Sequence, residues 1–560
     1  MGLLDYLPSG RGESLPNLLS RSIRTVISSG ILSNHVSGGL PSVARTALSR
    51  GFNVRTIHAL QAASNPNRLA IVDDARSVTY RQANSEINQL ANSLHKDFGV
   101  GEDDPVMIMM ENRCEYLLAW FALFRLGAAA VHASYRLSPD ELEYQVEHSR
   151  SQIIFVSEKS IDAARTLQER YPEYRLKLIA LDSVPDAESV YDYETFVSKS
   201  SSDFPDIEVP DGAGDNVVYT SGTTGKPKGT VRDMQDQASP ADLFRILDAL
   251  PMNSGERHLV VSPIYHSGGQ AFTMIQIALG NTIYLRPGFN AEETLQHLDR
   301  WTINSIFMVP TMIRRVLNLP DDLHERYPCN ALNCIVSSAA PFPQDLRERA
   351  IERFGADAIH DLYGATEIGL ITHISGAEML EKPQSSGRAL PGQEIKILGE
   401  NNNELPPNEI GTVYVYSGQA MSGYLKNEDA NDEITEGNWM TVEDMGYLDD
   451  DGYLYLTGRA QDMVITGGVN VYPVEIQQRL ERHDSVDTAA VFGIPDEEWG
   501  EKLAAVIVPN NGSVDFDELE DYAREHLHRA KVPKEWGSRD ELPRTDTGKV
   551  LKRKLEEDFG

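Results

Sequence analysis

Residues 219–229 decide the fold expected for this chain, and they read Tyr219-Thr220-Ser221-Gly222-Thr223-Thr224-Gly225-Lys226-Pro227-Lys228-Gly229. The glycines allow the backbone to approach an anion closely, and successive amides and hydroxyls donate hydrogen bonds to phosphate oxygens. Two lysines add positive charge. A stretch rich in Gly, Thr and Ser is otherwise typical of a surface loop, but the density of donors favours a phosphate-binding loop. Because no Ser or Thr follows a Gly-Lys pair, this is not a P-loop of the GxxxxGK[ST] kind.

Four further segments accompany this loop. In chain order they are Tyr363-Gly364-Ala365-Thr366-Glu367, Asp444-Met445-Gly446-Tyr447, Gly458-Arg459-Ala460-Gln461-Asp462 and Pro543-Arg544-Thr545-Asp546-Thr547-Gly548-Lys549. Together the five segments resemble motifs of the adenylate-forming superfamily, which includes acyl-CoA synthetases, peptide-synthetase adenylation domains and beetle luciferases. The resemblance covers residues 56–555, and among acyl-CoA synthetases the whole chain is most similar to the bacterial fatty-acyl type.

The pattern along the chain predicts an α/β fold. From residue 56 to 455, helical stretches alternate with short apolar runs, which is typical of a body with largely parallel strands. After residue 458 the pattern changes to that of a small α+β domain. We therefore predict a basic leader at 1–55, an adenylation domain at 56–459, and a mobile C-terminal domain at 460–560 that carries Lys549.

The resemblance implies a role for each matched residue. Activation of a carboxylate requires attack on the α-phosphorus of ATP, so positioning and charge stabilisation carry most of the barrier. The implied catalytic residues are Lys549, Thr366, Glu367 and His266. Glu367 and Thr220 are the implied Mg²⁺ ligands, since this hard ion takes oxygen ligands. The implied nucleotide-binding and CoA-binding residues are Thr220, Ser221, Gly222, Thr223, Thr224, Gly225, Lys226, Lys228, Tyr363, Gly364, Asp444, Arg459, Gly467 and Gly468.

Pro263-Ile264-Tyr265-His266-Ser267-Gly268-Gly269 resembles the acyl-pocket segment of the superfamily, which implies that His266 faces the reacting carboxylate. No Asp is present here to pair with an amino-acid ammonium group. Ser267, Gly268 and Gly269 are expected to leave room, and the apolar run 271–279 to line a channel for an alkyl chain. Gln270 stands where one long-chain relative carries a Trp gate, so a gated tunnel is not predicted.

The leading hypothesis is an ATP- and Mg²⁺-dependent ligase that converts a medium- or long-chain fatty acid to acyl-AMP and then to acyl-CoA, with release of AMP and pyrophosphate. Two alternatives stay open. One is an adenylating enzyme that loads a carrier protein or acts on an aryl acid, and the other is a non-catalytic ligand-binding homologue. Two departures from the family pattern are Gln461 at the hinge, where Asp or Lys is usual, and Arg232-Asp233 after the phosphate loop.

Charge and composition limit the partners and the location. The net charge of −33 opposes nucleic-acid binding, which requires a basic surface. The three cysteines lack CxxC spacing, and no run of eighteen apolar residues occurs, which favours a cytoplasmic protein. The leader, by contrast, holds six Arg against one Asp and one Glu, with an apolar stripe at helical spacing. It is expected either to pack on the body or to bind the inner membrane face peripherally. The oligomeric state is left open.

Overall fold

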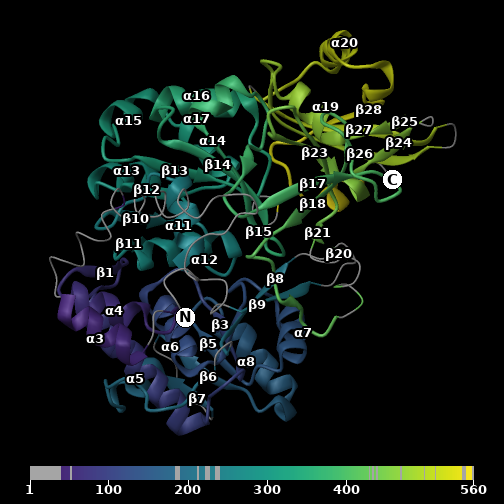
Figure 1. Ribbon diagram of the computed structural model, residues 1–560. Coiled ribbons are helices and arrows are strands. Elements are labelled where there is room, and N and C mark those ends of the chain that lie inside the picture. The colour runs from purple at the N-terminus through teal and green to yellow at the C-terminus, as the bar shows by residue number, and fades with distance from the viewer. Residues whose placement is uncertain are drawn as a thin grey trace.

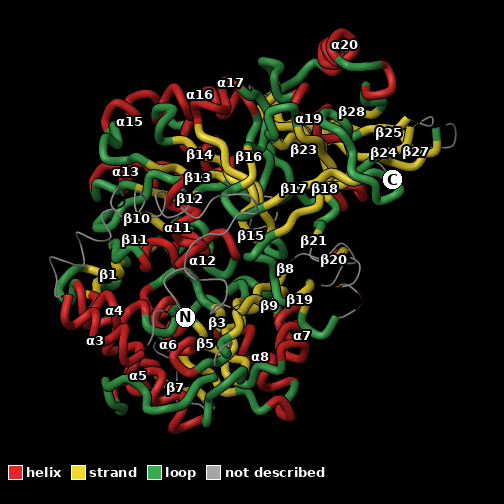
Figure 2. Tube along the Cα trace, in the orientation of Figure 1, coloured by secondary structure: helices red, strands yellow, loops and turns green. Residues whose placement is uncertain are grey.

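The computed structural model describes Ser29 and residues 40–557, except for 51–52, 183–188, 211–212, 221–226, 234–239, 428, 430, 432–433, 437–438, 467–468, 497–498, 511 and 545–549. Two large sheets with helices between and around them form the body, and a smaller unit containing the last strands lies at one side of it (Figures 1 and 2). Among the described helices, none combines the length and the hydropathy that crossing a membrane requires.

The first large sheet has strand order β16-β15-β14-β13-β12-β10-β11-β1-β2. Its pairs are parallel from β1 through β11, β10, β12 and β13 to β14, and antiparallel at both edges. The strands are β1 Leu69–Val72, β2 Ser77–Thr79, β10 Arg257–Val260, β11 Thr282–Leu285, β12 Ser305–Phe307, β13 Cys334–Ser337, β14 Ile359–Ala365, β15 Gly369–Ser375 and β16 Arg388–Ala389.

The second large sheet has strand order β19-β9-β8-β4-β3-β5-β6-β7, and it is parallel from β8 to β7. Only β9 and β19 run antiparallel to their neighbours. The strands are β3 Pro105–Met109, β4 Ala129–His132, β5 Ile153–Val156, β6 Lys177–Ala180, β7 Val190–Asp192, β8 Asp215–Thr220, β9 Lys228–Asp233 and β19 Gly423–Tyr424.

The main core lies between these two sheets. Helix α6, Cys114–Leu126, is buried at every position, which explains its nearly uninterrupted apolar sequence. Helix α5, Tyr80–Phe98, begins with a Thr79–Gln82 capping box and ends at Gly99 in the left-handed region. Helix α12, Ser267–Ala278, packs in the same interior. The remaining helices of the body are α3 Leu40–Arg50, α4 Ile57–Ser64, α7 Pro139–Ser149, α8 Ile161–Arg170, α9 Tyr193–Ser198, α11 Pro240–Ala249, α13 Ala291–Arg300, α14 Pro310–Leu317, α15 Asp321–Arg326, α16 Gln344–Phe354 and α17 Gly376–Glu381.

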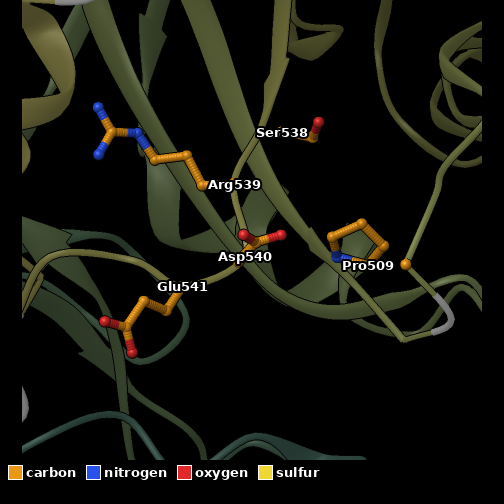
Figure 3. Close-up of a pocket in the computed structure, with 6 residues that line it drawn as sticks. Pro509, Ser538, Arg539, Asp540 and Glu541 are labelled. Atoms are coloured by element: carbon orange, nitrogen blue, oxygen red, sulfur yellow. The ribbon is translucent and has the colours of Figure 1, made fainter.

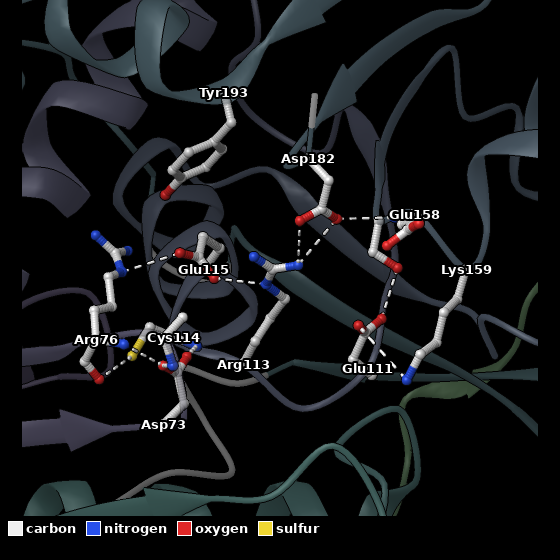
Figure 4. A network of polar contacts seen from close by, with 12 residues as sticks. Asp73, Arg76, Glu111, Arg113, Cys114, Glu115, Glu158, Lys159, Asp182 and Tyr193 are labelled. Atoms are coloured by element: carbon white, nitrogen blue, oxygen red, sulfur yellow. Dashed lines mark hydrogen bonds and ion pairs between the residues drawn. The ribbon is translucent and has the colours of Figure 1, made fainter. Parts of the chain in front are cut away.

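A chain of ion pairs links the two large sheets at the start of α6 (Figure 4). Arg76, in the turn between β1 and β2, contacts Glu86 at 2.8 Å and Glu115 at 3.0 Å. Arg113 contacts Glu115 at 2.8 Å and Asp182, which follows β6, at 3.2 Å. Because the Glu115 side chain is only 7% exposed, it is shared by two guanidinium groups away from most solvent.

We predict that Glu115→Gln lowers the free energy of unfolding by about 2–4 kcal/mol, because it leaves two partly buried guanidinium groups without their shared charge. The measurement is urea-induced unfolding. The matched control is Glu293→Gln, whose side chain is 54% exposed and lies 3.2 Å from Arg286; an exposed pair of this kind contributes about 0–1 kcal/mol. Equal losses in the two variants would contradict the structural role of the chain of ion pairs.

Two smaller sheets complete the described chain. One has order β20-β21-β18-β22-β23 with β17 on β18, and the other has order β25-β24-β27-β26 with β28 on β27. The strands of the first are β17 Glu394–Leu398, β18 Gly411–Tyr416, β20 Thr435–Glu436, β21 Trp439–Met440, β22 Asp444–Leu448 and β23 Leu454–Arg459. The elements of the C-terminal unit are β24 Val464–Thr466, β25 Val469–Val471, α19 Pro473–Leu480, β26 Val486–Asp496, β27 Gly500–Pro509, α20 Phe516–His526, β28 Glu535–Ser538 and α21 Lys552–Glu556.

The C-terminal unit contacts the body through charged groups. Arg314, on α14, donates from Nη1 to the backbone oxygen of Asp487 at 2.5 Å, and its guanidinium lies 3.6 Å from the Asp487 carboxylate. The α/β fold class with a separate small C-terminal unit is confirmed. The predicted boundary at 459/460 falls between β23 and β24, which belong to different sheets.

Candidate functional site

The carboxyl ends of two strands from different sheets meet at the predicted phosphate and metal site. Parallel strands place ligand sites at their carboxyl edge, and both β8, ending at Thr220, and β14, ending at Ala365, are the last parallel strands before an antiparallel partner. Thr220 donates from Oγ1 to Glu367 Oε1 at 3.4 Å, although the two residues are 147 positions apart. The structure therefore brings the two expected Mg²⁺ ligands together.

The turn that carries Thr366 and Glu367 is tightly constrained. A Cβ atom at Gly364 would lie 2.2 Å from the backbone oxygen of Gly369, and Gly369 itself has φ of +79°. These two positions therefore require glycine. The backbone oxygen of Glu367 accepts a hydrogen bond from Met421 N at 2.7 Å, which fixes the turn from the outside.

Two further hydroxyls complete this part of the site: Tyr424, which the sequence analysis did not identify, and Ser267, which it expected only to leave room in the acyl pocket. Tyr424 donates from its phenol to Glu367 Oε1 at 3.2 Å, and its ring lies 4.8 Å from Lys228 Nζ. Ser267 Oγ lies 2.8 Å from Thr366 Oγ1. Burial, reinforced by Glu367, raises the pKa of Tyr424, so the phenol stays protonated and acts as a donor. Tyr424 lies in none of the motifs. The sequence marks it only as an aromatic residue that follows a glycine.

Asp444 is held from two sides. In the β22–β23 pairing it lies opposite Arg459, which donates from Nε to Oδ1 at 3.1 Å. Tyr363, at the end of β14, donates to Oδ2 at 2.7 Å. Burial and the adjacent Asp444 carboxylate raise the pKa of Tyr363 well above its usual value, so the phenol remains a donor. Two of the residues predicted to bind the nucleotide, Tyr363 and Arg459, are therefore each hydrogen-bonded to a third, Asp444.

The donor set fits the groups that the motifs imply. A carboxylate has about four acceptor positions, and Asp444 uses one on each oxygen, so it can accept two ribose hydroxyls as well. Glu367 and Thr220 present neighbouring oxygen atoms, which suits Mg²⁺ when phosphate and water supply the other ligands.

The first turn of α12 differs from the expected open pocket. A Cβ at Gly268 would lie 2.8 Å from the Phe307 ring, and one at Gly269 would lie 2.6 Å from the backbone oxygen of Pro263. The glycines therefore allow close packing rather than leaving room, which corrects that expectation. The apolar run 271–279 is likewise mainly core, since Phe272, Met274, Ile277 and Leu279 pack in the buried clusters. His266 precedes the helix, with its ring 4.5 Å from that of Tyr265.

A buried chain of hydrogen bonds begins at Gln270 of α12 and ends at Tyr116 of α6. Gln270, 5% exposed, accepts at Oε1 from Asn216 Nδ2 at 2.7 Å. Asn216 Oδ1 in turn accepts from Trp120 Nε1 at 3.0 Å and lies 2.6 Å from His132 Nε2, and His132 Nδ1 lies 2.6 Å from the Tyr116 hydroxyl. Burial lowers the pKa of His132 to about 3, so the ring is neutral at pH 7 and joins the chain as one donor and one acceptor.

Several predicted site residues lie outside the described residues, namely Ser221, Gly222, Thr223, Thr224, Gly225, Lys226, Gly467, Gly468 and Lys549. A separate depression lies in the C-terminal unit (Figure 3), lined by Pro509, Gly512, Ser538, Arg539, Asp540 and Glu541. None of these six residues was predicted to act in the site. They contribute no group to the contacts of Glu367 or Asp444 described above.

Two profiles of known protein domains match this chain. The profile of the AMP-binding enzyme family matches residues 59–425, and the profile of the AMP-binding enzyme C-terminal domain matches residues 475–549. The first match alone covers more than half of the chain and includes Thr220, Thr366, Glu367 and Tyr424.

Similar proteins match over nearly their whole length. The 2-succinylbenzoate–CoA ligase of Bacillus licheniformis is 31% identical over 496 residues, which is 88% of this chain and 98% of that protein. The indoleacetate–CoA ligase of Aromatoleum aromaticum is 29% identical over 495 residues, 88% of this chain and 95% of that protein. The structure of o-succinylbenzoate CoA synthetase from Bacillus subtilis, in complex with its acyl-adenylate intermediate, superimposes with a TM-score of 0.77 at 27% identity, covering 90% of this chain and 98% of that one.

Proposed function

Because this chain belongs to the AMP-binding enzyme family, we propose that it activates a carboxylic acid as an acyl-adenylate and then forms an acyl-CoA thioester. The enzyme uses ATP, Mg²⁺ and coenzyme A. The observation that carries the proposal is the convergence of Thr220 and Glu367 from two different sheets.

In the adenylation step, this chain's residues chiefly bind and orient the reactants. Asp444, held by Tyr363 and Arg459, accepts the ribose hydroxyls of ATP. Thr366 and the loop at residues 220–228 donate hydrogen bonds to the phosphates. Bound Mg²⁺ neutralises charge on the phosphate oxygens. Lys549 supplies a further positive charge while the acid's carboxylate oxygen attacks the α-phosphorus and pyrophosphate leaves.

In the second step the C-terminal domain rotates and exchanges Lys549 for the segment Thr466–Asn470. Gly467 and Gly468 allow the pantetheine arm to pass close to the backbone. The CoA thiol attacks the adenylate carbonyl, the C–S bond forms, and AMP leaves. A neutral Gln461 at the hinge is compatible with rotation, because the rotation requires backbone freedom rather than charge.

We propose a compact aryl acid as the substrate, in place of the fatty acid expected from the sequence. The two curated relatives described above are named for aryl acids, 2-succinylbenzoate and indoleacetate, which favours the aryl alternative. The buried chain from Gln270 to Tyr116 supports the same choice, since an alkyl tunnel in that direction would have to break its hydrogen bonds. Gln270 Nε2 also finds no acceptor among the described residues, and a polar substituent on the acid would suit it.

The test is a panel of acids assayed by pyrophosphate release with and without CoA. We expect 2-succinylbenzoate, indoleacetate or a related aryl acid to give the highest rate, and acyl-CoA to be detected by mass. A preference for octanoate or palmitate would restore the fatty-acid hypothesis. Pyrophosphate release without thioester formation would favour a carrier protein as acceptor.

We also propose peripheral membrane contact through the leader. Ser29 is 3% exposed, and its backbone oxygen accepts from Ser254 N at 2.7 Å, so this point of the leader is anchored to the body. Residues 1–28 precede the anchor and contain Arg11, Arg21 and Arg24. Each Arg near an anionic surface contributes about 1 kcal/mol.

We predict that deletion of residues 1–28 weakens sedimentation with anionic vesicles at low salt by at least about tenfold, because three such arginines are removed. Turnover of a water-soluble acid serves as the control and is expected to stay unchanged. If the truncated chain sediments as well as the full chain, the leader is a packing element and does not bind membranes.

A further inference from the structure

Arg232 lies beside the candidate site on a strand of the second large sheet, but its guanidinium reaches into the first. It is the fifth residue of β9, opposite Asn216 of β8. Its Nε donates to the backbone oxygen of Thr366 at 3.0 Å, and its Nη2 donates to the same oxygen and to that of Ala365, the latter at 3.5 Å. One side chain therefore joins the strand after the phosphate loop to the turn that carries Glu367.

The Thr366 turn depends on this contact for its orientation. The Thr366 hydroxyl is bonded to Ser267, and the Glu367 backbone oxygen is bonded to Met421 N. The Glu367 carboxylate accepts from Thr220 of β8 and from Tyr424 of β19. Arg232 alone, among the contacts described for the turn, comes from the strand that continues the phosphate loop. Burial lowers the pKa of Arg232 to about 10, with Glu367 opposing the shift, so the group remains charged at pH 7.

We propose that Arg232 is a positioning residue for adenylation, which holds the Thr366 hydroxyl at the α-phosphate position by clamping the Thr366 backbone oxygen. The inference rests on the proposed function. A contact from two nitrogens requires the planar guanidinium, since all the donors of a lysine ammonium lie on one nitrogen. Arg232 is also a departure from the family pattern, so the clamp is a feature of this chain and not of the motif.

The test compares binding of AMP and adenosine by calorimetry in the absence of metal. For Arg232→Met we expect the affinity for AMP to fall about tenfold, because a charge-assisted hydrogen bond that orients the turn is lost. The affinity for adenosine should stay within about twofold, since Asp444 and Tyr363 are untouched. Arg232→Lys should be intermediate, because one donor remains.

The matched control is Arg353→Met. Arg353 is also half-buried and donates from Nη2 to the backbone oxygen of Tyr327 at 2.9 Å, but it belongs to α16 and contacts none of the site residues. We expect this variant to change thermal stability as much as Arg232→Met does while binding AMP like the wild type.

The outcomes distinguish a failure of the proposed function from a failure of the positioning role of Arg232. If wild-type enzyme neither binds AMP nor releases pyrophosphate with any acid, the proposed function is wrong. If the wild type binds AMP but Arg232→Met loses AMP and adenosine equally, or loses neither, the positioning role is overturned. If Arg232→Met does not fold, Arg232→Lys decides: AMP affinity equal to that of the wild type would overturn the two-pronged clamp.

Discussion

Lys549→Ala is expected to lower the rate of acyl-adenylate formation by about 10²–10³-fold, the usual cost of removing one group that stabilises transition-state charge. Lys549 lies outside the described residues, but Arg544 and Val550 on either side of its loop form a β-bridge. The measurement is acid-dependent pyrophosphate exchange.

The same variant should convert supplied acyl-adenylate to thioester at nearly the wild-type rate, because Lys549 acts only in the first orientation of the domain. Lys554→Ala is a suitable control, since Lys554 is an exposed residue of α21 five positions further along. Equal losses in both half-reactions would show that Lys549 supports the fold or the hinge and not the adenylation step.

In the proposed mechanism, the orientation of the C-terminal domain affects the rates of both half-reactions. Arg314 is 8% exposed where it contacts Asp487, and Glu481 nearby has its pKa raised to about 7 by burial, with Arg314 opposing. A domain that rotates must break and remake such contacts. In the proposed mechanism, we expect the charged groups at this interface to contribute to the balance between the two orientations together with Gln461.

The fold class could be predicted from the sequence for a physical reason. Two motifs lie where a strand ends, at Thr220 of β8 and Ala365 of β14, so their residues follow a buried apolar run such as Val217-Val218, whereas Asp444 begins β22. The pairing of Asp444 with Arg459 follows from a hairpin of neighbouring strands. The fold class and the superfamily could therefore be predicted without coordinates.

Contacts between distant segments could not be predicted in the same way. Tyr424 and Glu367 are 57 positions apart, and Arg232 and Thr366 are 134 apart, so only packing of the two sheets brings them together. The expectation that the acyl pocket has room at its glycines was wrong for a related reason. Gly268 and Gly269 suggested space in the sequence, but Phe307 and the Pro263 backbone occupy it. Glycines in a sequence indicate that another group packs closely against the backbone. Whether that group is a ligand or a protein side chain depends on the tertiary structure.

Glu367→Gln is expected to raise the Mg²⁺ concentration needed for half-maximal pyrophosphate exchange by at least about tenfold. Tyr424 and Thr220 both donate to Oε1, so the amide oxygen of the new side chain will turn toward them. The amide nitrogen, a donor, then takes the place of Oε2. A metal ion would meet hydrogen atoms where it requires an oxygen ligand, while the local packing would be retained.

We expect Glu367→Gln to raise the Mg²⁺ requirement without lowering the stability of the protein. Gln has nearly the shape of Glu, and the backbone contact to Met421 is unaffected, so the free energy of unfolding should stay within about 1 kcal/mol of the wild-type value. Glu381→Gln, an exposed position on α17, is the control for loss of one negative charge in this part of the chain. An unchanged Mg²⁺ titration in Glu367→Gln would remove Glu367 from the metal site, and the oxygen pair with Thr220 would then be structural.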